Sequence, residues 1–150
     1  RLFDNGEFLS ARTRSWRLAF RESFLFARPS TWGETARDGW TAFSVGADPA
    51  SPNFFAYRET EGTASALADA VSGLTDATIS DVRAYTNLSA WDAVTYNGTR
   101  DGANVRGRVY TQERNGKTYT VWVEIADTPE GLEVLQSLIE TMVDSIEFYE

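Results

Sequence analysis

"TPEGLEVLQSLIETMVDSIEF", residues 128–148, is the stretch of this 150-residue chain that decides its fold. Thr128 can cap a helix, and Pro129 suits the first helical position. Apolar residues then recur every three or four positions, at Leu132, Leu135, Leu138, Ile139, Met142 and Val143. This spacing places them on one side of a helix, which predicts that this side is buried. Ser145 ends the pattern, and the alternation of Ile146 and Phe148 predicts a last strand that pairs with a sheet edge.

Upstream of this helix, short segments alternate apolar and polar residues, as half-buried strands do. The expected strands are "WRLAF" (16–20), "FLFARP" (24–29), "WTAFSVG" (40–46), "FFAYRE" (54–59), "ATISDVRAY" (77–85), "AWDAVTY" (90–96), "VRGRVYTQE" (105–113) and "KTYTVWVEIA" (117–126). Asn115 and Gly116 predict a tight hairpin between the last two strands. A loop is expected at "STWGETARDG" (30–39), a hairpin connection at "NGTRDGAN" (97–104), and a short helix capped by Thr63 at "TASALADAVSGL" (63–74).

Length and composition favour one domain, at residues 16–150, preceded by an arm or linker remnant at residues 1–15. No apolar run approaches the roughly 20 residues of a membrane span, so no transmembrane segment is expected in this chain. The chain begins at Arg1 rather than Met. This start suggests that a secretion signal or anchor has been removed, which predicts an extracytoplasmic protein, exported or tethered to a membrane.

The absence of histidine and cysteine excludes several kinds of chemistry. Ser-His-Asp and Cys-His catalysis, the usual zinc sites and histidine-based proton transfer all need one of these residues. No cofactor is expected. The glycine-rich segment 97–108 superficially resembles a calcium loop, but Arg108 stands where a bidentate Glu is needed, so no metal site is predicted. The remaining catalytic alternative is a carboxylate-based hydrolase that uses two of Asp81, Asp92 and Glu124.

The net charge of −8 is concentrated at one end of the chain. From Glu124 onward there are eight acids and no base, whereas the rest of the chain is close to neutral. This balance argues against nucleic-acid binding, which needs a basic surface. The acidic side of the last helix, with Glu130, Glu133, Glu140 and Asp144, is either a solvated surface or a docking face for a protein with a basic surface.

Two groups of side chains are candidates for ligand binding. Trp40, Tyr57, Trp91 and Trp122 could line a sugar- or ring-binding platform, although rings of this size are more often core. Arg106 and Arg108 lie two residues apart on a predicted strand and so share one sheet face. They could clamp a carboxylate or phosphate, or they could pair with neighbouring acids in a structural role.

Three segments together resemble the PsbP family, extrinsic subunits of photosystem II and their relatives outside photosynthesis. They are "FLFARPSTW" (24–32), "GANVRGRVYTQERNGKTYTVWVEI" (102–125) and "TPEGLEVLQSLIETMVDSIEF" (128–148). The related Mog proteins, which bind the Ran GTPase, share this layout. The resemblance spans roughly residues 16–149. The chain has a single lysine, Lys117, and lacks a convincing basic arm, so it is similar to a bacterial, non-photosynthetic relative.

The resemblance implies an α+β fold: a three-layer α/β/α sandwich with a central antiparallel sheet. It also implies binding to partners rather than catalysis. The leading hypothesis is therefore a non-catalytic binding or accessory domain that acts through protein contact outside the membrane. The alternative is a small-ligand or carbohydrate-binding module with a pocket between sheet and helix. The oligomeric state is not predicted.

Overall fold

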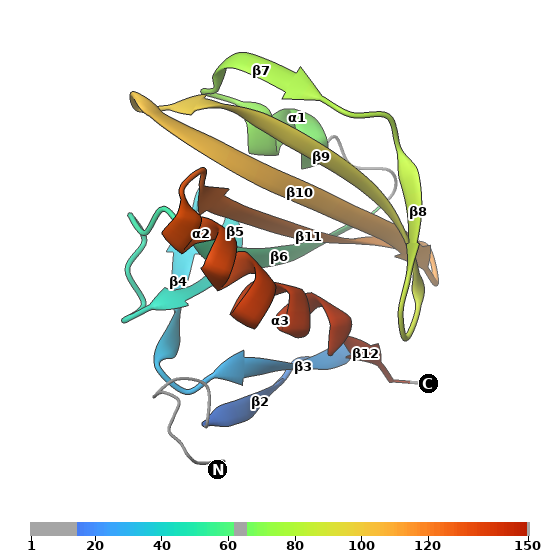
Figure 1. The fold of residues 1–150 in the computed structure, drawn as a ribbon. Coiled ribbons are helices and arrows are strands. Elements are labelled where there is room, and N and C mark those ends of the chain that lie inside the picture. The colour runs from blue at the N-terminus through green and yellow to red at the C-terminus, as the bar shows by residue number, and fades with distance from the viewer. Residues whose placement is uncertain (1–14, 62–65, 150) are drawn as a thin grey trace.

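The computed structural model describes residues 15–61 and 66–149 as a mostly β structure with one long helix (Figure 1). Its elements are β2 (Trp16–Phe20), β3 (Phe24–Pro29), β4 (Trp32–Arg37), β5 (Trp40–Val45), β6 (Phe54–Glu61), α1 (Ala66–Val71), β7 (Thr75–Ile79), β8 (Arg83–Thr86), β9 (Ala90–Arg100), β10 (Ala103–Arg114), β11 (Lys117–Ala126), α2 (Pro129–Val134), η2 (Leu135–Ile139), α3 (Glu140–Asp144) and β12 (Glu147–Phe148). The segments α2, η2 and α3 are consecutive turns of one 16-residue helix, called the long helix below.

The strands form two antiparallel sheets. The large sheet has eight strands in the order β4-β5-β6-β11-β10-β9-β7, and β8 also pairs with β9. The small sheet has the order β12-β3-β2. Its strand β12 pairs Phe148 with Phe24 of β3. The last strand predicted from Ile146 and Phe148 therefore exists, but it pairs with the small sheet and not with an edge of the large one.

Tight turns join the longest strands. At Asn115 and Gly116, φ angles of 54° and 79° support the predicted hairpin between β10 and β11. The hairpin connection predicted over residues 97–104 exists, but β9 continues to Arg100, so only Asp101 and Gly102 make the turn. By contrast, the loop predicted over residues 30–39 is wrong. There, β4 pairs with β5 along its whole length, and the turn is confined to two residues after Arg37.

The long helix begins as predicted, because the Thr128 side chain accepts a hydrogen bond of 3.0 Å from the Gly131 N–H. Its apolar side is buried at Leu135, Ile139 and Met142. The middle segment η2 has π-helical hydrogen bonding, which the apolar spacing did not indicate. Ser145 ends the helix and ties it to the small sheet: its Oγ accepts a hydrogen bond of 2.8 Å from the Ala27 N–H and donates one of 2.7 Å to the Met142 carbonyl.

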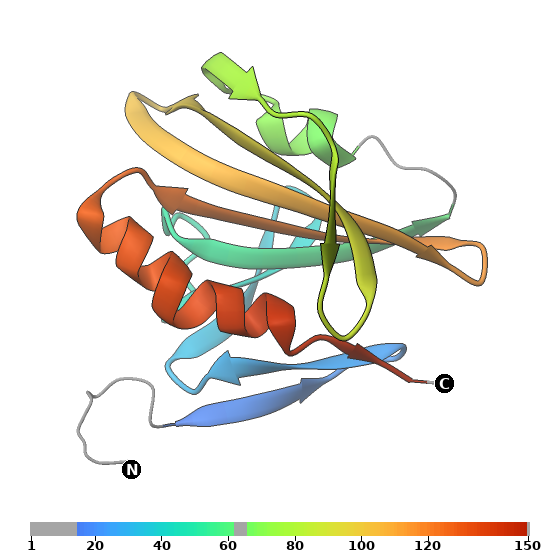
Figure 2. The same ribbon diagram turned by 45° about the vertical axis from the view of Figure 1, so that its right-hand side comes forward.

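The two faces of the large sheet are covered differently (Figures 1 and 2). One face shares a core with the long helix and the small sheet, in which residues such as Phe26, Val121 and Ile139 pack together. Within residues 15–61 and 66–149, the opposite face packs only against α1 and the turn after it, around Trp40 and Trp122. The first side is called the helix side below, and the second the α1 side.

The predicted three-layer α/β/α sandwich is wrong. Of the described residues, 57% are in strands, and these form two sheets around one long helix. The physical reason lies at the two ends of the chain: strands β2, β3 and β12 form a separate small sheet over the helix instead of extending the large one. On the α1 side, six helical residues are too few to make a full layer.

Two sequence predictions concern residues outside the described part of the chain. These are the arm at residues 1–15, of which only Ser15 is described, and the Thr63 cap. Within residues 15–61 and 66–149, no helix combines the length and apolar character needed to cross a membrane.

Candidate functional site

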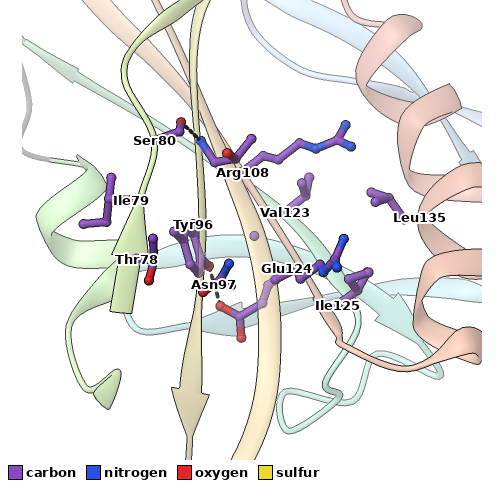
Figure 3. A pocket seen from close by; sticks show the side chains of 13 residues that line it. Thr78, Ile79, Ser80, Tyr96, Asn97, Arg108, Val123, Glu124, Ile125 and Leu135 are labelled. Atoms are coloured by element: carbon purple, nitrogen blue, oxygen red, sulfur yellow. Dashed lines mark hydrogen bonds between the residues drawn. The ribbon is translucent and has the colours of Figure 1, made fainter. Parts of the chain in front are cut away.

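A cavity of about 410 Å³ lies on the helix side of the large sheet and is called the trough (Figure 3). Its lining follows from the strand register, which aligns residues of β7, β9, β10 and β11 in three neighbouring rows. The outer rows are Thr78, Asn97, Arg106 and Ile125 on one side, and Ser80, Thr95, Arg108 and Val123 on the other. The middle row is Ile79, Tyr96, Gly107 and Glu124.

Alternation along the strands turns these rows into a channel. Successive side chains of a strand point to opposite faces of the sheet. The side chains of the two outer rows project to the helix side and form two ridges, whereas those of the middle row project to the α1 side, so only the backbone of the middle row lines the floor between the ridges. The ridges are two residues apart, about 7 Å at the usual rise per residue. Leu135 of the long helix closes one end, and β7, the last strand of the sheet on this side, forms the other.

The chemistry of the lining changes along the trough. The helix end is apolar, with Val123 and Ile125 about 1% exposed and Leu135 8% exposed. The β7 end carries the hydroxyl and amide groups of residues such as Thr95 and Asn97. Between these ends stand the two predicted arginines. The trough is therefore apolar at one end, cationic in the middle and polar at the other.

Each trough arginine is paired with an acid from the chain around the long helix. Arg106 Nε lies 3.0 Å from Asp127 Oδ1, and Arg108 Nη1 lies 3.2 Å from Glu140 Oε2. Arg108 also donates a hydrogen bond of 3.3 Å to the Tyr110 hydroxyl. Desolvation of the Arg108 guanidinium lowers its pKa, but Tyr110 and Glu140 outweigh this effect, so the pKa is raised overall. Arg108 therefore stays charged beside the trough.

At Gly107 the floor of the trough consists of backbone alone, and the Tyr96 ring lies directly behind it. A Cβ atom at this position would lie 2.1 Å from the Tyr96 ring, which covers Gly107 on the α1 side. The Tyr96 hydroxyl donates a hydrogen bond to Glu124 and accepts one of 2.7 Å from the Trp122 indole N–H. Burial, followed by the charge and hydrogen bond of Glu124, raises the pKa of Tyr96 far above its usual range.

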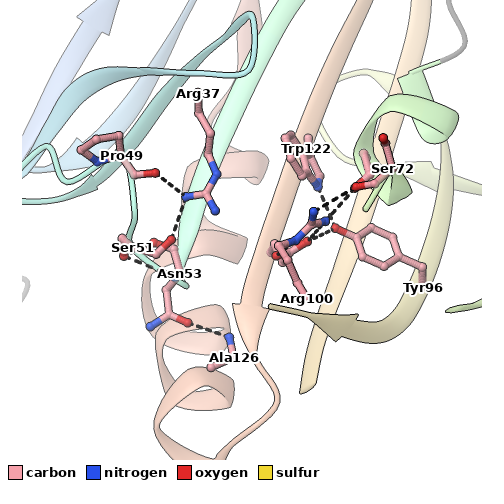
Figure 4. Close-up of polar contacts among 11 residues, drawn as sticks. Arg37, Pro49, Ser51, Asn53, Ser72, Tyr96, Arg100, Trp122 and Ala126 are labelled. Carbon is pink, nitrogen blue, oxygen red and sulfur yellow. Dashed lines mark hydrogen bonds and ion pairs between the residues drawn. The ribbon is translucent and has the colours of Figure 1, made fainter. Parts of the chain in front are cut away.

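Arg100 completes this buried network behind the floor (Figure 4). It contacts both carboxylate oxygens of Glu124, which is 1% exposed. Its remaining donors reach the carbonyls of Ala70 and Ser72, at 2.8 and 3.1 Å, at the end of α1. The negative charge of Glu124 is therefore compensated by Arg100, and the pair connects α1 to the sheet. Asp81 and Asp92 are exposed, and among the described residues no interaction joins them to Glu124.

The four candidate aromatic residues do not form one open platform. Trp40 and Trp122 pack on the α1 side, whereas Trp91 and Tyr57 pack on the helix side. Each of these tryptophans is only 2% exposed. A guanidinium already covers Trp40, because the Arg58 Cζ lies 4.3 Å from its ring centroid. The trough uses none of these four side chains.

The four candidate acids of the long helix separate into two pairs. Glu130 and Glu133 are exposed near its start. Glu140 is held by Arg108, and Asp144 accepts hydrogen bonds from the Tyr85 hydroxyl and from Asn87 Nδ2. The second pair therefore ties the helix to strands β8–β10 and their connections, although Asp144 is exposed there, as Glu130 and Glu133 are near the helix start.

Sequence reasoning missed Tyr96, Gly107 and Arg100. Their roles depend on the register of β9 against β10 and β11, and no local motif reveals that register. The closeness of Arg106 and Arg108 was visible because it follows from spacing within one strand.

No family model matches the sequence, and no curated protein matches it. Among solved structures, the chain is similar to cyanobacterial PsbP (CyanoP) from Synechocystis sp. PCC 6803, with 14% identity, a TM-score of 0.65, and coverage of 97% of this chain and 99% of that one. A structure from Bacteroides thetaiotaomicron VPI-5482 is similar with 14% identity and a TM-score of 0.51, over 85% of this chain and 45% of that chain. The chain therefore has a PsbP-like fold.

Proposed function

We propose that this chain is a non-catalytic accessory domain that binds a partner protein outside the membrane, through the trough and the adjoining edge strand β7. The observation that carries the proposal is that the trough reaches this edge of the large sheet, where apolar side chains are exposed. Ile79 belongs to the middle row, so its side chain projects to the α1 side of β7, where it is 44% exposed, and Val82, just beyond the strand, is 64% exposed. Exposed apolar groups beside a cavity are typical of interaction surfaces.

Strand β7 adds backbone hydrogen-bonding capacity to this surface. In the described part of the chain it pairs only with β9, and all five of its residues are exposed. The N–H and C=O groups of its outer edge can therefore pair with an added strand. Such an added strand from the partner would lie at the open end of the trough and could place a side chain or chain end inside it.

The charge distribution supports a partner with a basic surface. Glu130 and Glu133 are exposed near the start of the long helix, and the chain as a whole carries a net charge of −8. Opposite charge would speed the encounter, and salt would weaken it. Support for a place outside the membrane comes from the resemblance to extrinsic subunits, and fractionation of source cells would test it.

A pair of matched variants tests the partner proposal. Ile79→Glu combined with Val82→Glu places charge on the β7 surface, whereas Leu88→Glu changes a residue of similar exposure, 65%, in the turn after β8. Immobilised wild-type protein, the double variant and the control would be compared for capture of proteins from an extract of source cells. We expect the double variant alone to lose a partner that wild type and Leu88→Glu retain. Equal capture by all three proteins would contradict the proposal.

A second candidate function is a small-ligand module that uses the trough alone. Its volume of about 410 Å³ falls within the range of small-molecule sites. A thermal-shift screen distinguishes the two functions, because a small-ligand module is stabilised by compounds of low molecular weight. The Val82→Glu change alone, which lies outside the trough lining, should leave such stabilisation largely intact.

A further inference from the structure

We propose that the trough recognises a carboxylate that carries an adjacent apolar group, with the carboxylate held between Arg106 and Arg108. This inference rests on the proposed function, because it specifies the chemistry of the same binding surface. The two arginines project from β10 toward the helix side, and Gly107 between them turns its Cβ position to the α1 side, so no side chain separates the arginines within the channel. An acid in the channel is therefore within reach of both ridges.

Both guanidinium groups retain donors for a second anion. The Arg106 side chain is 55% exposed and contacts Asp127 through Nε. The Arg108 side chain is 30% exposed and contacts Glu140 and Tyr110 through Nη1. A guanidinium carries five N–H donors, so one ion pair does not exhaust it. Their planar geometry suits a carboxylate, which accepts parallel hydrogen bonds.

The two ends of the trough define the rest of the ligand. A carboxylate between the arginines places its substituent toward Val123, Ile125 and Leu135, where an apolar group is sheltered from water. Thr95 and Asn97 stand toward the other end and offer groups that can hydrogen-bond an amide or hydroxyl. The combination fits an acid with a short branched side chain and one further polar group.

The acids beside the trough favour a carboxylate over a phosphate. Asp127 and Glu140 already neutralise part of the arginine charge, and they repel a second anion. A singly charged carboxylate suffers this repulsion less than a phosphate carrying up to two charges. The same reasoning makes Glu140 a competitor for Arg108, so removing its charge should strengthen binding of the ligand.

The test uses N-acetyl-leucine and its uncharged amide, which differ only at the carboxylate. Isothermal titration calorimetry at low salt should give at least a tenfold lower Kd for the acid. Arg106→Gln combined with Arg108→Gln should abolish this preference, and Arg17→Gln, at an exposed position on β2, should preserve it. Glu140→Gln should lower the Kd of the acid severalfold. Circular dichroism would establish that each variant is folded.

Equal affinity for acid and amide, or an acid preference that survives in the double arginine variant, would overturn the inference. Two further probes identify the source of the carboxylate: a pentapeptide ending in free leucine and the same peptide amidated. Tighter binding of the free peptide than of N-acetyl-leucine indicates a chain end, and weaker binding indicates a free small acid. The titrations could show no acid preference while the Ile79→Glu/Val82→Glu variant still loses the captured partner protein. In that case the carboxylate inference would fail, but the proposed partner contact would be retained.

Discussion

Arg100 forms a bidentate ion pair with Glu124: Nε lies 2.9 Å from Oε2, and Nη2 lies 2.9 Å from Oε1. The Glu124 side chain is 1% exposed, and that of Arg100 is 18% exposed. A buried ion pair of this kind contributes little net stability compared with apolar residues, but breaking it leaves one charge without a partner. Glu124 lies on β11 and Arg100 on β9, and Arg100 also contacts the end of α1, so loss of this pair should weaken the packing of all three elements.

Arg100→Met is expected to lower the free energy of unfolding by about 3–5 kcal/mol, because Glu124 would remain buried without its partner. The double variant Arg100→Met/Glu124→Leu should recover a large part of this loss, since it removes both charges. Urea denaturation followed by circular dichroism measures the difference. If the double variant were as unstable as the single one, the loss of stability could not be due to a buried Glu124 charge without a partner.

Gly107→Ala is expected to destabilise the protein by roughly 1–3 kcal/mol, because a Cβ atom there would meet the Tyr96 ring at 2.1 Å. In a Tyr96→Ala background the ring is absent, so the same substitution should cost almost nothing. A double-mutant cycle by chemical denaturation gives the coupling energy between the two sites. Additive effects would mean that the ring does not limit the space at Gly107.

Stability should fall at alkaline pH, in part because of Tyr96. Burial and the charge of Glu124 raise the pKa of the folded Tyr96 phenol, whereas in the unfolded chain it ionises near pH 10. The stabilising contribution is thus complete below about pH 10 and is lost progressively as the pH rises above it. Tyr96→Phe should reduce the slope of unfolding free energy against pH by up to about 1.4 kcal/mol per unit.

Denaturation of wild type and Tyr96→Phe between pH 9 and 11.5 would measure this difference. The pKa values of Tyr57 and Tyr110 are also raised by burial, so the variant should keep part of the pH dependence. Parallel curves for the two proteins would show that Tyr96 ionises equally well in the folded and unfolded states.

Ile146→Ala is expected to cost about 2–5 kcal/mol, because this side chain is 1% exposed in the core that joins the long helix to the small sheet. Tyr149→Ala is the matched control, since Tyr149 is 41% exposed and should change stability by less than about 0.5 kcal/mol. Thermal unfolding separates the two outcomes. Similar melting temperatures for both variants would place Ile146 outside the cooperative core.

Local signals account for the parts of the fold that the sequence predicted correctly. The start of the long helix and the Asn115–Gly116 hairpin depend on neighbouring residues, so capping and turn preferences reveal them. Strand β4 was mistaken for a loop because Gly33 and Glu34 are weak strand formers, and pairing with β5 overrides this preference.

The separate small sheet and the trough depend on contacts between distant segments. Nothing near Phe148 indicates that its partner is Phe24 rather than a residue of the large sheet. Likewise, Arg106 and Arg108 could be placed on one face, but their acidic partners, Asp127 just before the long helix and Glu140 within it, could not be identified. Strand register and packing between distant elements determine both the small sheet and the trough. Neither register nor packing produces a pattern that can be recognised within a short stretch of sequence.

The join between Ala27 and Ser145, which spans 118 residues, constrains the order of events during synthesis. Strand β3 is synthesised before its partner β12 and before the helix that covers it, because both begin more than 100 residues after the start of β3. Until then, the aromatic faces of Phe24 and Phe26 lack their native covering, so the growing chain exposes apolar surface. The small sheet therefore cannot be completed before residue 148 has been synthesised.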